Sequence, residues 1–196
     1  MRKLSIELSE KLSLSFIDDY YNKARYSISL KYDKLLNGNF ENDFCGRTTA
    51  SVEDEAKELF AELEKEATLC LLSYLESIFR MDFIIRCDLK KRDKLSLLFR
   101  KSYDRSKRKY QYGFKDVVIN GWKSIYPEYK NTFDGIIQMM DYRNWLAHGR
   151  YWTFKDNPEK YRYWAVYKNI ELFENAFINM LNRPSKVGDM SQDKIY

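Results

Sequence analysis

Apolar residues recur every three or four positions along most of this chain, which is the spacing of one face of an α-helix. The first such stretch begins at about Ser15 and reaches Leu35, and Asn37-Gly38-Asn39 behind it is typical of a helix end. A longer stretch opens with the capping-box sequence Ser51-Val52-Glu53-Asp54 and continues to about Cys87. The pattern therefore predicts an all-α protein with long central helices.

The second half of the chain repeats this pattern in shorter segments. With seven Gly and three Pro in 196 residues, the chain has few points at which a helix must stop. We expect a single domain over residues 1–196, with an N-terminal arm at 1–14, a helical bundle at 15–182 and a flexible tail at 183–196. The later helices are expected at about Leu89–Lys109, Phe114–Ile125, Asn131–His148 and Tyr163–Asn182.

Charge is distributed unevenly, although the formal net charge of the whole chain is only +5. Basic residues are dense from Arg86 to Lys115, whereas the predicted helix before them is acidic from Glu53 to Glu66. Such a split favours a polyanionic partner, and a solvated charged surface is the alternative. Tyrosines interleaved with the basic run suit stacking on single-stranded RNA. The RNA-binding candidates of this run are Lys107, Arg108 and Lys109.

Several classes of protein are disfavoured by what the sequence contains. The spacing of Cys45, Cys70 and Cys87 matches neither a zinc pattern nor a redox pair, and Cys70 falls in an apolar run as an expected core thiol. With one His and scattered acids, we expect no metal and no other cofactor. The odd cysteine count and the lack of a signal sequence favour a cytoplasmic protein, and no segment is apolar for the ~18 residues of a membrane span.

Candidate chemistry lies at the end of the predicted helix 131–148. His148 is the only histidine in the chain, and histidine is the side chain whose unperturbed pKa, ~6.5, lies near neutrality. It would take a proton from an RNA 2′-hydroxyl, while Arg143 would bind the phosphate and stabilise its developing charge. Asn144 continues the apolar stripe of this helix, so its polar group needs a cleft or an interface. The alternatives are a structural helix-end histidine and an ion-paired arginine.

One copy of this site is incomplete. Arg143 precedes His148 by five residues, which is ~140° around and ~7.5 Å along an ideal helix. RNA cleavage of this kind works best with both a base and an acid, and the chain supplies one histidine. A two-fold axis near the helix end would bring a second His148 to the site, so we expect a homodimer.

The stretch Arg143-Asn144-Trp145-Leu146-Ala147-His148 resembles the R-x4–6-H motif of HEPN-domain proteins, whose common variant reads Arg-Asn-x-x-Ala-His-Gly. The resemblance covers residues 15–182 in pattern but about seven residues in specific identity. It implies a HEPN-like up-and-down helical bundle that acts as a dimeric, metal-independent ribonuclease in toxin–antitoxin or antiphage systems. It also implies that Arg143 and His148 are the catalytic pair, that Asn144 is the polar residue often found after the arginine, and that the cut RNA carries a 2′,3′-cyclic phosphate. We therefore take Arg143, Asn144 and His148 as the catalytic candidates.

The residues after the motif depart from one subgroup of that family. HEPN toxins with nucleotidyltransferase antitoxins often read His-x-Tyr, whereas here Gly149 and Arg150 separate His148 from Tyr151. Control by modification of that tyrosine is therefore not expected. Arg150 is instead a candidate second phosphate contact, and Tyr151 is a candidate RNA contact beside the site.

The sequence therefore predicts a HEPN-type endoribonuclease that cleaves tRNA or mRNA as a toxin or defence effector, with a possible antitoxin or defence-system partner. One alternative is a catalytically silent HEPN-like module that dimerises and binds RNA or a protein. Another is a purely structural α-helical interaction protein in which the motif is accidental.

Overall fold

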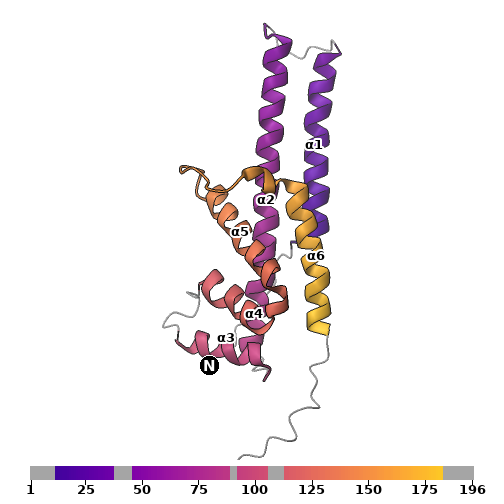
Figure 1. The fold of residues 1–196 in the computed structure, drawn as a ribbon. Coiled ribbons are helices and arrows are strands. Elements are labelled where there is room, and N and C mark those ends of the chain that lie inside the picture. The colour runs from indigo at the N-terminus through magenta and orange to yellow at the C-terminus, as the bar shows by residue number, and fades with distance from the viewer. Residues whose placement is uncertain (1–11, 38–45, 89–91, 106–112, 183–196) are drawn as a thin grey trace, which may run out of the picture. The chain divides into compact units, whose positions relative to one another are not determined.

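A computed structural model of the protein describes residues 12–37, 46–88, 92–105 and 113–182 (Figure 1). These residues form helices joined by short connections, and none of them lies in a β-strand, so the all-α prediction is confirmed. None of the described helices combines the length and the apolar character that crossing a membrane requires. The α-helices are α1 (Leu14–Leu36), α2 (Thr49–Asp88), α3 (Lys94–Arg105), α4 (Asn120–Ile125), α5 (Lys130–Ala147) and α6 (Tyr163–Asn182).

Two helix starts differ from their predicted positions by two residues or more, and in both a polar side chain explains the shift. The start of α2 lies ahead of Ser51 because Thr48 Oγ1 accepts the backbone N–H of Ser51 at 3.2 Å and so acts as the cap. The start of α3 lies at Lys94, after the predicted Leu89, because Asp93 Oδ1 accepts the Ser96 N–H at 3.1 Å. The predicted segment 114–125 is a π-helical stretch at Phe114–Ile119 that leads into α4.

Contacts divide the chain into two compact units. One consists of residues 5–78 and 136–167, and we call it the motif unit because it contains Arg143 and His148. The described residues of the other unit fall within 79–135 and 168–182, and we call it the aromatic unit. The expectation of one domain over 1–196 stays a prediction, and most of the predicted arm and all of the predicted tail lie outside the described residues.

The aromatic unit has a core of rings packed in tilted and edge-on arrangements. Phe79 is fully buried, with its ring centroid 4.8 Å from that of Phe173 and 6.4 Å from that of Trp122. Gly121 packs so closely on this core that a Cβ atom there would lie 2.5 Å from the Phe99 ring. Only a glycine fits at this contact between α3 and α4.

Arg86 belongs to the core of the aromatic unit and not to a basic surface. Its Nε donates to Asp82 Oδ2 at 2.8 Å, its Nη1 lies 3.1 Å from Asp93 Oδ1, and its Cζ stands 5.1 Å from the Trp122 ring centre. The side chain is 8% exposed. The predicted basic run therefore loses its first member, because two carboxylates and an indole enclose this guanidinium.

In the motif unit, α1 lies along the first half of α2 (Figure 1), and Tyr32 donates its hydroxyl to Glu55 at 2.9 Å between them. Tyr163, at the start of α6, stacks on Tyr21 with ring centroids 3.8 Å apart and is fully buried. The prediction that Cys70 is a core thiol is wrong, because this residue is exposed on α2. The side chains that face inward nearby on α2 are Leu71, Leu72 and Leu75.

Candidate functional site

The motif stands at the carboxyl end of α5, and a six-residue hydrogen-bonded loop closes that end. The Arg150 N–H donates to Trp145 O at 3.1 Å and the Gly149 N–H to Leu146 O at 3.4 Å, which is the bond pattern of a Schellman cap. Gly149 has φ +79°, the left-handed conformation in which a glycine commonly ends a helix. Arg150 follows with φ +57°, a conformation that a residue with a Cβ adopts less readily.

His148 is the first residue beyond α5 and its side chain is exposed. Its N–H still donates to Asn144 O at 3.0 Å, so its backbone continues the last helical turn. Its ring centroid lies 6.3 Å from that of Trp152. A single helix end thus presents the only imidazole of the chain to solvent, beside an indole.

The guanidinium of Arg143 lies between its own helix and α2. Its Nη1 donates to Asn144 Oδ1 at 3.2 Å, and its Nη2 lies 3.4 Å from Glu76 Oε2. The Arg143 side chain is 30% exposed and its Nε–H is buried with no acceptor among the described residues. The ion pair that was the alternative role for Arg143 is therefore present, and its contact with phosphate stays a prediction.

Arg150 is also engaged by a carboxylate of α2. Its two terminal nitrogens donate to Glu62 Oε2 and Oε1 at 2.7 and 2.6 Å. The hydrogen bonds from Arg150 lower the pKa of Glu62, although partial burial opposes them. A phosphate contact by Arg150 stays a prediction, and phosphate there would meet a guanidinium whose charge Glu62 already balances.

The remaining RNA-binding candidates are Tyr151 and the three basic residues 107–109. Tyr151 is 82% exposed, and its ring centroid lies 4.6 Å from that of Trp152. Lys107, Arg108 and Lys109 fall outside the described residues. The structure therefore brings Tyr151 near His148 through Trp152 and leaves the three basic residues as a prediction.

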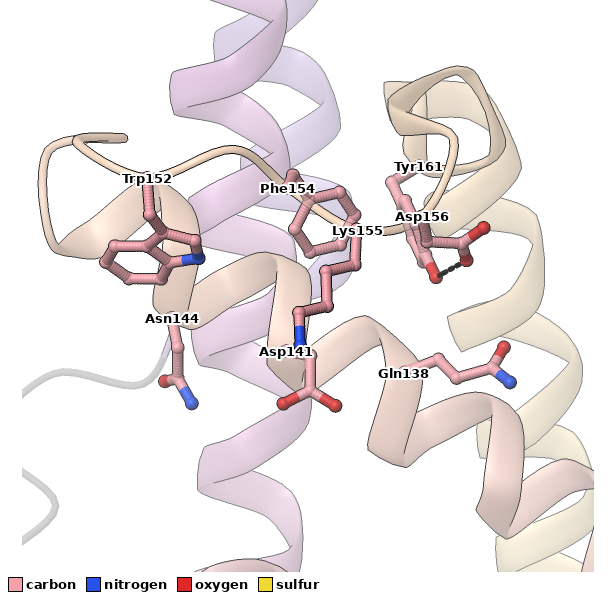
Figure 2. A pocket seen from close by; sticks show the side chains of 8 residues that line it. All are labelled: Gln138, Asp141, Asn144, Trp152, Phe154, Lys155, Asp156 and Tyr161. Carbon is pink, nitrogen blue, oxygen red and sulfur yellow. Dashed lines mark hydrogen bonds between the residues drawn. The ribbon is translucent and has the colours of Figure 1, made fainter.

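A pocket of about 650 Å³ opens beside the motif, between α5 and the connection that leads to α6 (Figure 2). The connection is held down by the Trp145 indole N–H, which donates to Trp152 O at 2.7 Å. It is also held by Tyr161, which stacks on Tyr142 of α5 with ring centroids 4.7 Å apart. The lining residues are Gln138, Asp141, Asn144, Trp152, Phe154, Lys155, Asp156 and Tyr161.

The Asp156 carboxylate of this pocket accepts several hydrogen bonds that stabilise its negative charge. Its carboxylate accepts hydrogen bonds from the Lys160 ammonium at 2.7 Å, the Tyr161 hydroxyl at 2.7 Å and the Asn157 N–H at 2.8 Å. These donors lower the pKa of Asp156 to about 2, so it is ionised at neutral pH. Burial and the adjacent Asp156 raise the pKa of Tyr161, so its hydroxyl keeps its proton and acts as a donor.

Sequence reasoning missed part of this pocket. It identified Asn144, but it gave Gln138, Phe154, Lys155 and Asp156 no role. A signal existed in the three-residue spacing of 138, 141 and 144, which puts these residues on one helix face. The described residues contain no cluster of His, Cys, Asp or Glu that would hold a metal ion.

Comparisons with known proteins give no relative, because no family model matches the chain and no significant match occurs among curated proteins or solved structures. The HEPN resemblance is therefore carried by residues 143–149 and their chemistry alone.

Proposed function

We propose that the protein is a metal-independent endoribonuclease of the HEPN type, acting in the cytoplasm as a toxin or antiphage-defence effector on tRNA or mRNA. The observation that carries this proposal is the exposure of His148, the only histidine, directly after α5. A general base must reach solvent-borne substrate, and a core histidine would not.

The proposed reaction needs no group beyond the protein and RNA. The His148 ring takes the proton of the 2′-hydroxyl, the 2′-oxygen bonds to the adjacent phosphorus, and the 5′-oxygen leaves as a hydroxyl after receiving a proton. His148 of the partner subunit supplies that proton, so the active form is a homodimer. The products are a 2′,3′-cyclic phosphate and a 5′-hydroxyl.

Arg143 is suited to the phosphate in this scheme. Hydrogen bonding to Asn144 and pairing with Glu76 restrict the guanidinium to one position, which lowers the entropy lost on binding. Its exposed fraction of 30% leaves room for a phosphate oxygen to approach. Asn144 therefore acts as a positioning residue in this proposal, linking the phosphate ligand to the pocket.

The test is cleavage of single-stranded RNA in EDTA by the purified full chain. We expect cyclic-phosphate ends, and losses of at least ~100-fold in rate for His148→Ala and for Arg143→Ala. Arg162→Ala removes an exposed guanidinium of the same unit, one paired with Glu159, and is expected to retain activity. Circular dichroism and melting temperature establish that each variant folds. A wild type that never cuts RNA contradicts the proposal.

A catalytically silent module that binds RNA or a protein is the second candidate. Glu76 pairs with Arg143 and Glu62 pairs with Arg150, so both motif-side guanidiniums already have carboxylate partners. RNA binding without cleavage in the same assay favours this candidate. Sedimentation tests the dimer, and a monomer with full nuclease activity would remove the need for a composite site.

A further inference from the structure

The pocket beside α5 is lined by aromatic and acidic side chains, which are not the residues that bind a phosphate. Its volume of about 650 Å³ falls in the range of small-molecule sites, which is ~300–1,000 Å³. One wall is aromatic and is formed by Trp152, Phe154 and Tyr161. Tyr161 is buried against Tyr142, whereas Trp152 is exposed, so the Trp152 indole is the ring that offers a stacking surface for a flat, polar ligand such as an unpaired base.

The opposite wall is polar and belongs to one face of α5. Figure 2 shows Gln138, Asp141 and Asn144 in a row along that helix. Residues three apart on a helix are neighbours, ~4.5 Å along the axis, so the row of three spans ~9 Å and its central residue lies one helical turn from each amide. Its centre is a carboxylate, with an amide on either side.

The charges in the pocket select for hydrogen-bond donors on the ligand. Two carboxylates, Asp141 and Asp156, line it together with one ammonium, that of Lys155. Asp156 already accepts from Tyr161 and Lys160. The two carboxylates repel a phosphate, although Lys155 and Lys160 partly offset them, whereas a neutral base with N–H groups can donate hydrogen bonds to them.

We propose that this pocket binds a guanine base of single-stranded RNA, with Asp141 accepting its N1–H and its exocyclic amino group. Guanine is the RNA base that places two donors side by side on one edge, and a carboxylate supplies two acceptors at the matching separation. Adenine, cytosine and uracil each put a lone pair next to their donor on that edge, which a carboxylate repels. Gln138 and Asn144 would donate to the remaining acceptors of guanine.

This inference rests on the proposed function for its biological setting and adds a substrate preference to it. Asn144 lines the pocket and accepts from the Arg143 guanidinium at 3.2 Å. A base in the pocket therefore brings its own phosphate toward Arg143. The cut is expected next to a guanosine.

Binding of mononucleotides to the full chain, followed by calorimetry, tests the pocket apart from catalysis. Guanosine 3′-monophosphate is expected to bind at least ~10-fold more tightly than adenosine 3′-monophosphate, the discrimination of one bidentate contact. The inosine nucleotide lacks the amino group and is expected to bind ~10-fold more weakly than guanosine. Asp141→Asn is expected to remove the guanine preference, and Gln138→Leu to weaken it, whereas Asp54→Asn, on the exposed start of α2, leaves it intact.

The outcomes separate the two proposals. Equal binding of the guanosine and adenosine nucleotides, or a preference that survives Asp141→Asn, overturns the guanine pocket. RNA cleavage without base preference overturns the pocket and retains the nuclease. Guanine-selective binding by a wild type that never cuts RNA retains the pocket and overturns the nuclease.

Discussion

Arg150 and Glu62 face each other as a fork against a fork, with both Nη atoms within 2.7 Å of a carboxylate oxygen. Arg150 follows the motif directly in left-handed backbone, and Glu62 lies 88 positions earlier on α2. The pair therefore fastens the chain reversal after His148 to a helix that is distant in sequence. Solvent screens this ion pair and so reduces its contribution to the stability of the fold, because the two side chains are 34% and 41% exposed.

Glu62→Gln is expected to lower the free energy of unfolding by about 1 kcal/mol, since it removes one charge of a bidentate pair that solvent partly screens. Glu58→Gln, an exposed glutamate of the same helix, is the matched control and should change it by less than ~0.5 kcal/mol. Urea unfolding at low and high salt measures both. Equal effects of the two variants, or a Glu62→Gln effect that grows with salt, would contradict this account.

Gly149→Ala tests the left-handed cap. A Cβ at Gly149 meets no atom within 4 Å, so its cost is the backbone conformation at φ +79°, about 1–2 kcal/mol. Gly135→Ala in α5 also meets no atom within 4 Å and has no positive φ, so it should stabilise by up to ~1 kcal/mol. Thermal unfolding compares the two, and the same sign for both would refute the assignment.

Arg86→Met tests our conclusion that Arg86 is a buried, ion-paired residue and does not belong to a basic RNA-binding surface. The substitution leaves Asp82 and Asp93 facing an apolar side chain, and we expect a loss of about 3 kcal/mol or more in the free energy of unfolding. Lys94→Met changes an exposed basic residue of α3 instead and should leave stability nearly unchanged. If Arg86→Met weakened RNA binding in the folded protein without destabilising it, a surface role for Arg86 would be restored.

The lowered pKa of Asp156 predicts that the motif unit loses stability as the pH falls. Its pKa of about 2 in the folded chain is below the ordinary value of ~3.9, so its contribution is full above pH ~4 and disappears as the pH falls toward ~2. The melting temperatures of wild type and Asp156→Asn should therefore converge across that window. Tyr161→Phe removes one of the donors and should narrow the gap in the same direction. A gap that is constant from pH 5 to pH 2 would show that this carboxylate is not the source.

The three-to-four-residue spacing of apolar positions predicted most of the helices, because this spacing depends only on residues that are close in sequence. Predicted α6 has the observed bounds, Tyr163–Asn182, and predicted α5 is shifted by one residue at each end. Cap choice was harder, since Thr48 and Ser51 both have a hydroxyl and only the folded chain shows which one accepts. The exposure of Cys70 was missed because α2 is long and its apolar residues do not all face one neighbour.

The motif could be recognised from consecutive residues of the sequence, but the residues that contact its arginines could not. Glu62 and Glu76 contact Arg150 and Arg143 from α2, and nothing in their spacing pairs them with those arginines. The pocket depends on the path of residues 152–161, which a hydrogen bond from Trp145 and ring stacking on Tyr142 determine. Such tertiary contacts leave no periodic trace in a single sequence.

The hydrogen bond from the Trp145 indole to the Trp152 carbonyl gives the protein an optical reporter. A ligand that enters between α5 and this connection either stacks on Trp152 or displaces the connection itself. Either event alters the fluorescence emission of Trp145 and Trp152. Trp122 is fully buried in the aromatic unit and Trp164 is half exposed on α6, so both supply a steady background. Occupancy of the pocket is therefore readable from the natural fluorescence of the unlabelled chain.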